Sequence, residues 1–193
     1  MPAGFSDNER EIITGKLKQA ALECMQRYGV RKTTVEQMTD MAGISKGAFY
    51  SFFDSKEALM FEVMDENGRP IQKQLGEQLQ TAHSAQQISD ALYDLCMNMK
   101  SSFVIDLIKN GEIDYLMRKL PEKAVTQSYT LDNQFIEEYF SGFLRTDVDP
   151  ATVITGMSML YSTILNMDWY PTGEYEKALR LLIDGFVDRI IKI

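Results

Sequence analysis

Three closely spaced helix starts between residues 33 and 59 constrain the fold of this chain more than any other feature. The run reads TTVEQMTDMAGISKGAFYSFFDSKEAL. Thr33 is followed three residues later by Glu36, a capping box that predicts the start of a short helix. Gly43 follows the apolar positions of that helix and can adopt the left-handed conformation that ends it. A second start at Ser45 then predicts two short helices joined by a tight turn, which is a helix-turn-helix.

The second of these helices, expected over residues 46–53, has two contrasting faces. Three phenylalanines at helical spacing take the side expected to pack inward: Phe49, Phe52 and Phe53. The opposite side carries a cation, a phenol, a hydroxyl and a position without a side chain: Lys46, Tyr50, Ser51 and Gly47. This face suits a helix end that enters a DNA groove, because a glycine lets the backbone approach closely while the longer side chains reach phosphates or base edges. A polar helix that only faces water is the alternative.

A third helix is expected to begin at Ser55, with Lys56 in its first turn. A lysine at that place opposes the helix dipole, which indicates a local partner such as a phosphate or a carboxylate. All three starts therefore carry a hydroxyl, and two have a lysine directly after it. We interpret them as helix ends that face an anion.

Residues 9–60 resemble the DNA-binding region of the TetR family of bacterial transcriptional regulators. The resemblance rests on Tyr28-Gly29, on TTVEQM, and on AGISKGAFYSFFDSKEAL. It implies phosphate contacts at Thr33, Thr34, Tyr50 and Lys56. It implies base-reading or groove-lining positions at Ser45, Lys46, Gly47, Ala48 and Ser51. Ala48 stands where the family often has threonine, and Ser51 where it often has histidine or tyrosine, so the operator sequence cannot be taken from a relative.

The charge of the chain is divided unevenly. The 193 residues carry a formal net charge of −8, but residues 1–60 hold eight acidic and eight basic side chains. The whole excess of acid therefore belongs to residues 61–193. An acidic body and a neutral N-terminal part would orient the molecule on DNA, and affinity would depend on helix ends and a few lysines.

Composition excludes several classes of protein. No apolar run approaches 18 residues and the start MPAGFSDNER lacks the form of a signal peptide, so we expect a cytoplasmic protein without a membrane segment. Cys24 and Cys96 are far apart and are expected to be reduced and buried, with a redox sensor as the alternative. His83 is the only histidine. We therefore expect no metal site, no cofactor and no catalytic pair, so the chain is not expected to be an enzyme.

The remainder of the chain shows helical periodicity and no sustained alternation, so we expect an all-α protein. Residues 1–54 are expected to form a three-helix, helix-turn-helix DNA-binding domain. Residues 55–193 are expected to form a helical effector-binding and dimerisation domain, with residues 55–68 as a connecting helix. Gly68-Arg69-Pro70 should interrupt or kink that helix.

Two C-terminal stretches carry more apolar surface than a single packed stripe requires. Residues 151–167 contain no charge, and residues 175–193 are apolar on more than one side. Two such helices predict a homodimer through an intermolecular four-helix bundle, as the resemblance also implies. A dimer would read two half-sites of an inverted-repeat operator. The alternative is that both helices only fill the core of a monomer.

The body also contains many soft and aromatic side chains, with twelve methionines, nine tyrosines and ten phenylalanines in the whole chain. Such side chains suit a cavity for an apolar or aromatic small-molecule effector, although the same pattern is typical of an ordinary core. The candidate pocket residues are Met99, Phe103, Tyr115, Tyr129, Tyr139, Met157, Tyr161 and Trp169. By resemblance, the effector would shift the spacing of the two DNA-reading heads.

The sequence thus predicts a homodimeric, ligand-responsive regulator of transcription that binds double-stranded operator DNA. Repression is favoured over activation. The second hypothesis is an all-helical small-molecule-binding or scaffold protein without specific DNA recognition. An enzyme has no nucleophile and base pair, phosphate loop or metal-ligand spacing to support it.

Overall fold

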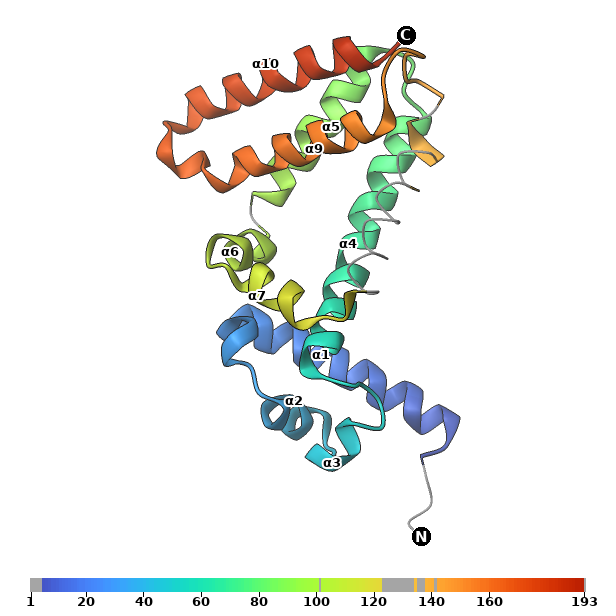
Figure 1. Ribbon diagram of the computed structural model, residues 1–193, viewed down its shortest axis with the longest axis vertical. Helices are drawn as coiled ribbons and strands as arrows, with labels where there is room; N and C mark the ends of the chain where they lie inside the picture. The colour runs from blue at the N-terminus through green and yellow to red at the C-terminus, as the bar shows by residue number, and fades with distance from the viewer. Residues whose placement is uncertain (1–4, 101, 123–133, 135–137, 141, 193) are drawn as a thin grey trace. The chain divides into compact units, whose positions relative to one another are not determined.

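The computed structural model describes residues 5–100, 102–122, 134, 138–140 and 142–192 (Figure 1). Its named elements are α1 (Asp7–Lys32), α2 (Val35–Ala42), α3 (Lys46–Phe49), α4 (Lys56–Gln80), α5 (Ala85–Met99), α6 (Phe103–Lys109), α7 (Glu112–Lys119), α9 (Pro150–Leu165), the short 3-10 helix η1 (Met167–Trp169) and α10 (Thr172–Ile190). The only strand-like pairing in the described ranges is an isolated bridge between Leu144 and Ile191. The prediction of an all-α fold is confirmed.

The chain forms two compact units. The first comprises Met1–Gly68 and Asn110–Leu120, and the second comprises Arg69–Lys109 and Pro121–Ile193. The boundary between the compact units follows Gly68, whereas the expected functional boundary lies between residues 54 and 55. That functional division stays a prediction.

Helix α1 follows the sequence expectation closely. Ser6 caps its N-terminus in a reciprocal capping box with Glu9. Regular helical geometry breaks at Gly29, whose φ of 77° lies in the left-handed region that glycine adopts without strain. A last short turn then leads to Lys32.

The start of α2 lies one residue later than expected. Thr34, and not Thr33, is the N-cap, and its hydroxyl accepts the Gln37 amide while the Gln37 side chain accepts the Thr34 amide. Thr33 is fully buried and its hydroxyl donates to the Gly29 carbonyl at 2.7 Å. The capping box predicted for Thr33 and Glu36 was therefore wrong, because packing removes the Thr33 side chain from the helix end.

Helix α3 is shorter than expected. It covers residues 46–49, and residues 50–52 continue as a turn. The Ser51 amide and hydroxyl both bond the Ala48 carbonyl, the latter at 2.7 Å, which favours a turn over a further helical repeat. Phe49 is fully buried, whereas Phe52 and Phe53 are only partly buried. One phenylalanine, not three, anchors this helix in the core of the first unit.

Helix α4 begins as predicted, since the Ser55 hydroxyl accepts the Ala58 amide at 3.0 Å. Of the interruption or kink expected at residues 68–70, the interruption was wrong, because the helix runs through Pro70 to Gln80. Pro70 is exposed, so water can satisfy the carbonyl four residues earlier that loses its helical donor.

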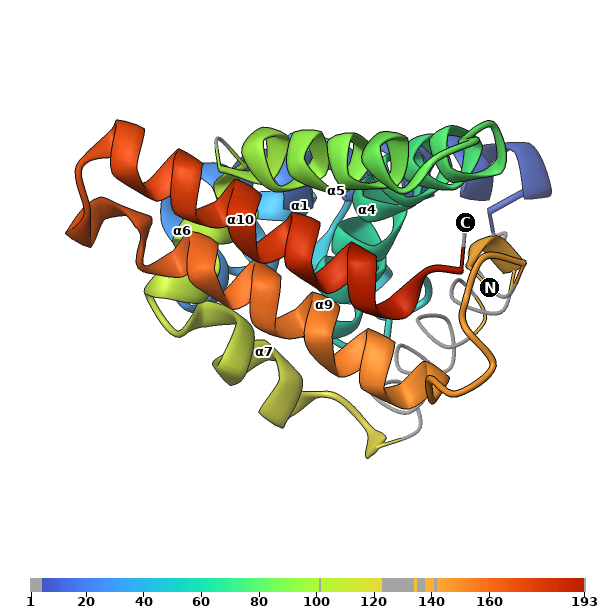
Figure 2. The same cartoon turned by 90° about the horizontal axis from the view of Figure 1, so that it is seen from above.

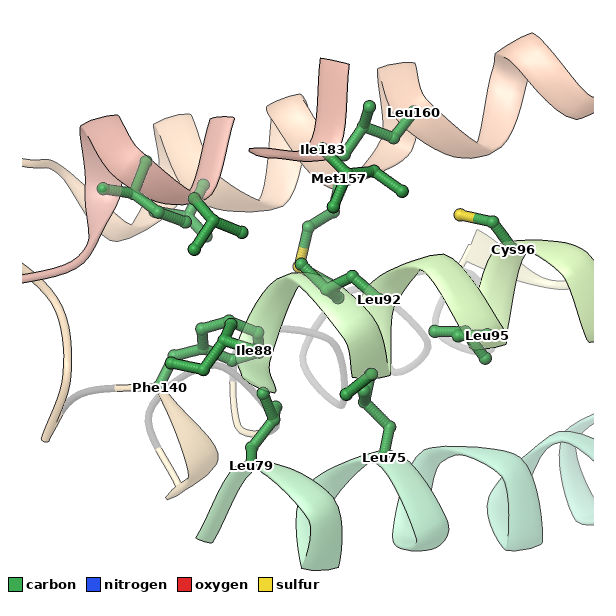
Figure 3. Close-up of a cluster of buried hydrophobic side chains, with 14 of the residues drawn as sticks. Leu75, Leu79, Ile88, Leu92, Leu95, Cys96, Phe140, Met157, Leu160 and Ile183 are labelled. Carbon is green, nitrogen blue, oxygen red and sulfur yellow. The ribbon is translucent and has the colours of Figure 1, made fainter. Parts of the chain in front are cut away.

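The second unit has one continuous hydrophobic core. It joins α4, α5, α9 and α10, with Leu75, Leu79, Ile88, Leu92, Met157 and Ile183 among the labelled side chains (Figure 3). Helix α10 packs against both α5 and α9, and Figure 2 shows α10 running between them. The bounds of α9 and α10 agree with the two apolar stretches found in the sequence. Of the helices that the structure describes, none combines the length and apolarity needed to cross a bilayer.

Close packing of α9 on α10 depends on Gly156. A Cβ atom at this position would lie 2.3 Å from Cε2 of Phe186 on α10, which is closer than packed atoms approach. We expect Gly156→Ala to lower the free energy of unfolding by about 1–3 kcal/mol, because the phenylalanine ring must leave its position. Denaturant unfolding measures this. Gly68→Ala on α4 is the control, since no atom lies within 4 Å of its added Cβ, and equal loss in both variants would contradict the prediction.

Candidate nucleic-acid interface

Six sequence-predicted residues come together around α3 on the surface of the first unit. We name this set the α3 surface: Ser45, Lys46, Gly47, Ala48, Tyr50 and Ser51. All are exposed except Ala48, which is partly buried. Ser45 caps the helix, because its hydroxyl accepts the Ala48 amide at 3.2 Å. The structure therefore presents one helix end with a cation, a phenol, hydroxyls and no bulky aliphatic side chain.

The α3 surface is held outward by its buried side. Phe49 is fully buried, and its ring contacts those of Phe53 and Tyr50 at centroid distances of 6.1 and 5.3 Å. The Tyr50 ring meets Phe49 edge-on and remains 54% exposed. Its phenol is thus fixed by packing on one side and available to a partner on the other.

Lys46 forms an ion pair with Glu36 at the edge of the α3 surface. The hydrogen bond between them lowers the pKa of Glu36 and raises the pKa of Lys46. Both side chains are more than half exposed, so the pair contributes little to stability. Lys46 can exchange this carboxylate for a phosphate at small cost.

The two threonines predicted to contact phosphate differ. Thr34 is exposed at the N-terminus of α2, where its hydroxyl lies beside the free amides of the first turn. Thr33 is fully buried and bonded to Gly29, so its side chain is not part of any exposed face. We therefore leave Thr33 out of the proposed DNA contacts.

Lys56 has partners that the sequence did not indicate. Its ammonium group donates to the carbonyls of Val30, Arg31 and Thr33 at 2.9, 3.2 and 2.6 Å. The local partner expected from its position against the α4 dipole is, in the free protein, a set of backbone carbonyls. The predicted phosphate contact of Lys56 is not tested by these bonds.

Arg10 supports the α3 surface and was missed by the sequence reasoning. Its guanidinium donates to the Ser51 carbonyl at 2.7 Å and lies 4.7 Å from the centroid of the Phe52 ring. The ring of Phe52 also contacts the ring of Phe5, with 5.4 Å between their centroids. No local signal could have shown this contact, because Arg10 and Ser51 are 41 residues apart.

Residues 17–63 match the family model described as bacterial regulatory proteins of the TetR family. These residues are therefore similar to the DNA-binding region of TetR-family regulators. The matched residues contain α2, α3 and the start of α4, so they include the whole α3 surface. TetR-family members are DNA-binding transcriptional regulators and not enzymes, which agrees with the functional class predicted from the sequence.

Solved structures show the same fold over nearly the whole chain. A protein of Mesorhizobium loti assigned to TetR-family regulators has a TM-score of 0.66 at 17% identity, over 95% of this chain and 98% of that one. A TetR-family regulator of Streptomyces coelicolor has a TM-score of 0.65 at 14% identity, over 92% and 95%. The regulator FadR of Bacillus subtilis, solved with stearoyl-CoA, has a TM-score of 0.59 at 14% identity, over 90% and 95%. No curated protein matched the sequence.

The predicted effector residues do not form one group. Tyr115 belongs to the first unit, where its ring lies 5.3 Å from the Arg31 guanidinium. Trp169 is 77% exposed and lines no interior in the described chain. The role of both residues stays a prediction, because helical spacing does not reveal which unit or which face a side chain joins. Tyr129 lies outside the described residues.

The other predicted effector residues belong to the second unit. Met157 is buried in its core, and Met99, Tyr139 and Tyr161 are partly buried against that core. Phe103, at the start of α6, is also partly buried. Their placement is compatible with core packing as well as with an effector site, so their role stays a prediction.

A small pocket of about 250 Å³ lies on the first unit between α1 and α2. Its lining residues are Glu23, Cys24, Arg27, Tyr28, Gln37, Asp40 and Met41. None of them was a predicted effector residue.

Cys24 and Cys96 are free and buried, as expected, and burial raises the pKa of the Cys96 thiol to about 11. A thiol of that pKa is protonated at neutral pH and reacts slowly.

Proposed function

We propose that this protein is a ligand-responsive repressor of the TetR family that binds an inverted-repeat operator as a homodimer. The observation that carries the proposal is the exposed α3 surface, with Gly47 at its centre and Phe49 buried behind it. A helix end of this kind lets the backbone approach a duplex while Lys46 and Tyr50 reach outward. The amides at the start of α2, beside Thr34, supply a further phosphate contact.

The surface of α10 supports the homodimer. Four residues at helical spacing form an uncharged, exposed stripe: Ala178, Leu181, Leu182 and Gly185. Leu181 is 75% exposed and Leu182 is 53% exposed. Helix α9 carries no charged residue, and its exposed Met159, at 66%, adds to the apolar surface of the pair. Two copies joined through α9 and α10 would bury this surface in a four-helix bundle.

An apolar or aromatic effector is supported by the soft side chains packed around the core of the second unit. Met99 is a flexible apolar side chain, and Tyr139 and Tyr161 have aromatic rings that lie partly buried against the same core, which suits a bulky apolar ligand. FadR of Bacillus subtilis, which shares the fold, was solved with stearoyl-CoA. Native mass spectrometry of the protein as purified from the expressing cell would identify a retained ligand by its mass.

Specific DNA binding is the central expectation. Titration with duplexes from the surroundings of its own gene should give saturable binding to an inverted repeat, at least about 1,000-fold tighter than to a scrambled duplex of equal length. Fluorescence anisotropy at fixed salt measures both affinities. Weak binding that is equal for all duplexes would contradict the proposal and would favour a helical scaffold or small-molecule-binding protein.

A further inference from the structure

The last turn of α1, after the break at Gly29, and the following Thr33 have carbonyl groups that no later turn of the helix can satisfy. Regular helical geometry ends at Gly29, where φ is 77°, and α2 does not begin until Val35. We name residues 29–33 the α1–α2 linker. Carbonyls at the end of a helix need donors from elsewhere, since no later turn supplies amides.

Lys56 supplies these donors from the first turn of α4. Its three ammonium protons match three linker acceptors, the carbonyls of Val30, Arg31 and Thr33, at 2.6–3.2 Å. A tetrahedral ammonium can donate in three directions, so this arrangement uses its full capacity. A cation also interacts favourably with the negative end of a helix, which explains why Lys56 is tolerated at the positive end of α4.

Two further contacts fix the same linker. The Thr33 hydroxyl donates to the Gly29 carbonyl at 2.7 Å, and the Arg31 amide donates to the Glu112 carboxylate at 2.8 Å. The Arg31 guanidinium donates to the Gly111 carbonyl, also at 2.8 Å. Hydrogen bonds from side chains thereby hold the linker along its length. The linker ends at Thr33, directly before Thr34, which caps α2.

The position of the α3 surface depends on this linker. Helix α2 packs against both α1 and α3, so a change in how α2 leaves α1 changes where α3 lies on the first unit. Lys46 differs from Lys56 in this respect. Its ammonium pairs with one exposed carboxylate and holds no backbone in place.

We infer that Lys56 is a positioning residue for operator binding, which acts by clamping the α1–α2 linker and does not contact phosphate. This inference rests on the proposed function, because it concerns the same DNA surface. We expect the ammonium to stay on these carbonyls in the complex, since a move to a phosphate would take this donor from the part-buried carbonyls of Val30 and Thr33. Among the predicted contacts, Lys46 and Tyr50 then carry the approach to the DNA backbone.

Lys56→Met and Lys46→Met form a matched pair that tests the inference, because each removes one charge and keeps an unbranched stem. Operator affinity is measured across a series of salt concentrations, at a temperature where circular dichroism shows each variant folded. Each substitution is present in both protomers of the proposed homodimer, so the loss of one phosphate contact per protomer decreases the magnitude of the slope of log K against log salt by about 1.8. We expect this decrease for Lys46→Met. We expect Lys56→Met to bind about tenfold more weakly with the parental slope.

Lys56→Arg and Thr33→Val sharpen the distinction. Arginine keeps the charge and binds phosphate well, but its planar guanidinium does not reproduce a three-carbonyl clamp. Lys56→Arg should therefore weaken binding, whereas a phosphate contact would be retained. Thr33→Val removes a linker hydrogen bond without changing charge and should also weaken binding at an unchanged slope.

A decrease of about 1.8 in the magnitude of the slope for Lys56→Met, or parental affinity in Lys56→Arg, would overturn the inference. Hydrogen exchange without DNA tests the clamp separately, since the amides of residues 30–35 should exchange faster in Lys56→Met than in Lys46→Met. Equal exchange in the two variants would also overturn it. Failure of the proposed function would give a different result, because the parent protein itself would then bind all duplexes with equal affinity.

Discussion

Gly47→Leu is expected to lower operator affinity by about 100-fold while leaving the fold and the dimer unchanged. The added Cβ meets nothing closer than the Ser45 hydroxyl at 3.9 Å, so leucine fits the free protein. The same side chain projects from the exposed α3 surface, where it would hold the backbone away from the duplex. A 100-fold loss corresponds to about 2.8 kcal/mol, the value of one or two good base or phosphate contacts.

Gly15→Leu on α1 is the matched control for this substitution. Gly15 is exposed, lies within a helix and has no atom within 4 Å of an added Cβ. Both substitutions replace glycine by a good helix former, so neither should destabilise the protein. Anisotropy with the operator duplex and thermal unfolding give the two readouts. If Gly47→Leu remains folded and dimeric and binds as tightly as Gly15→Leu, α3 does not enter a groove.

The α3 surface could be predicted from sequence because its signals are local. The caps at Ser45 and Ser55 depend on amides three residues away, and the structure confirms both. The threonine pair shows the limit of such signals. Thr33 and Thr34 are equivalent as capping residues in the sequence, and only the burial of Thr33 decides between them.

Lys56 and Arg10 show what the sequence could not provide. The carbonyls that Lys56 contacts lie 23 to 26 residues away, and the carbonyl that Arg10 contacts lies 41 residues away. A backbone carbonyl has no side-chain identity, so no residue pattern marks it as a partner. The unit to which Tyr115 belongs was not apparent either, since Asn110–Leu120 join the first unit whereas the segments before and after them join the second.

Leu181→Asp is expected to raise the dissociation constant of the homodimer by at least about 100-fold and to remove high-affinity operator binding. Leu181 is 75% exposed on α10, so aspartate is harmless in an isolated chain. In a dimer joined through α10, the substitution removes a buried leucine, worth about 1.5–3 kcal/mol, and buries an unpaired carboxylate from each copy. Sedimentation analysis over a range of protein concentrations measures the dissociation constant.

Ile71→Asp on α4 is the control for the dimer prediction, because Ile71 is also an exposed aliphatic residue of the second unit, at 42%, but is not part of α9 or α10. It should leave the dimer and operator binding intact. A Leu181→Asp protein reduced to a single head keeps an intact α3 surface, so it should still bind one half-site weakly, with a smaller dependence on salt. A stable Leu181→Asp dimer would show that the exposed stripe of α10 faces solvent and that another surface joins the two copies.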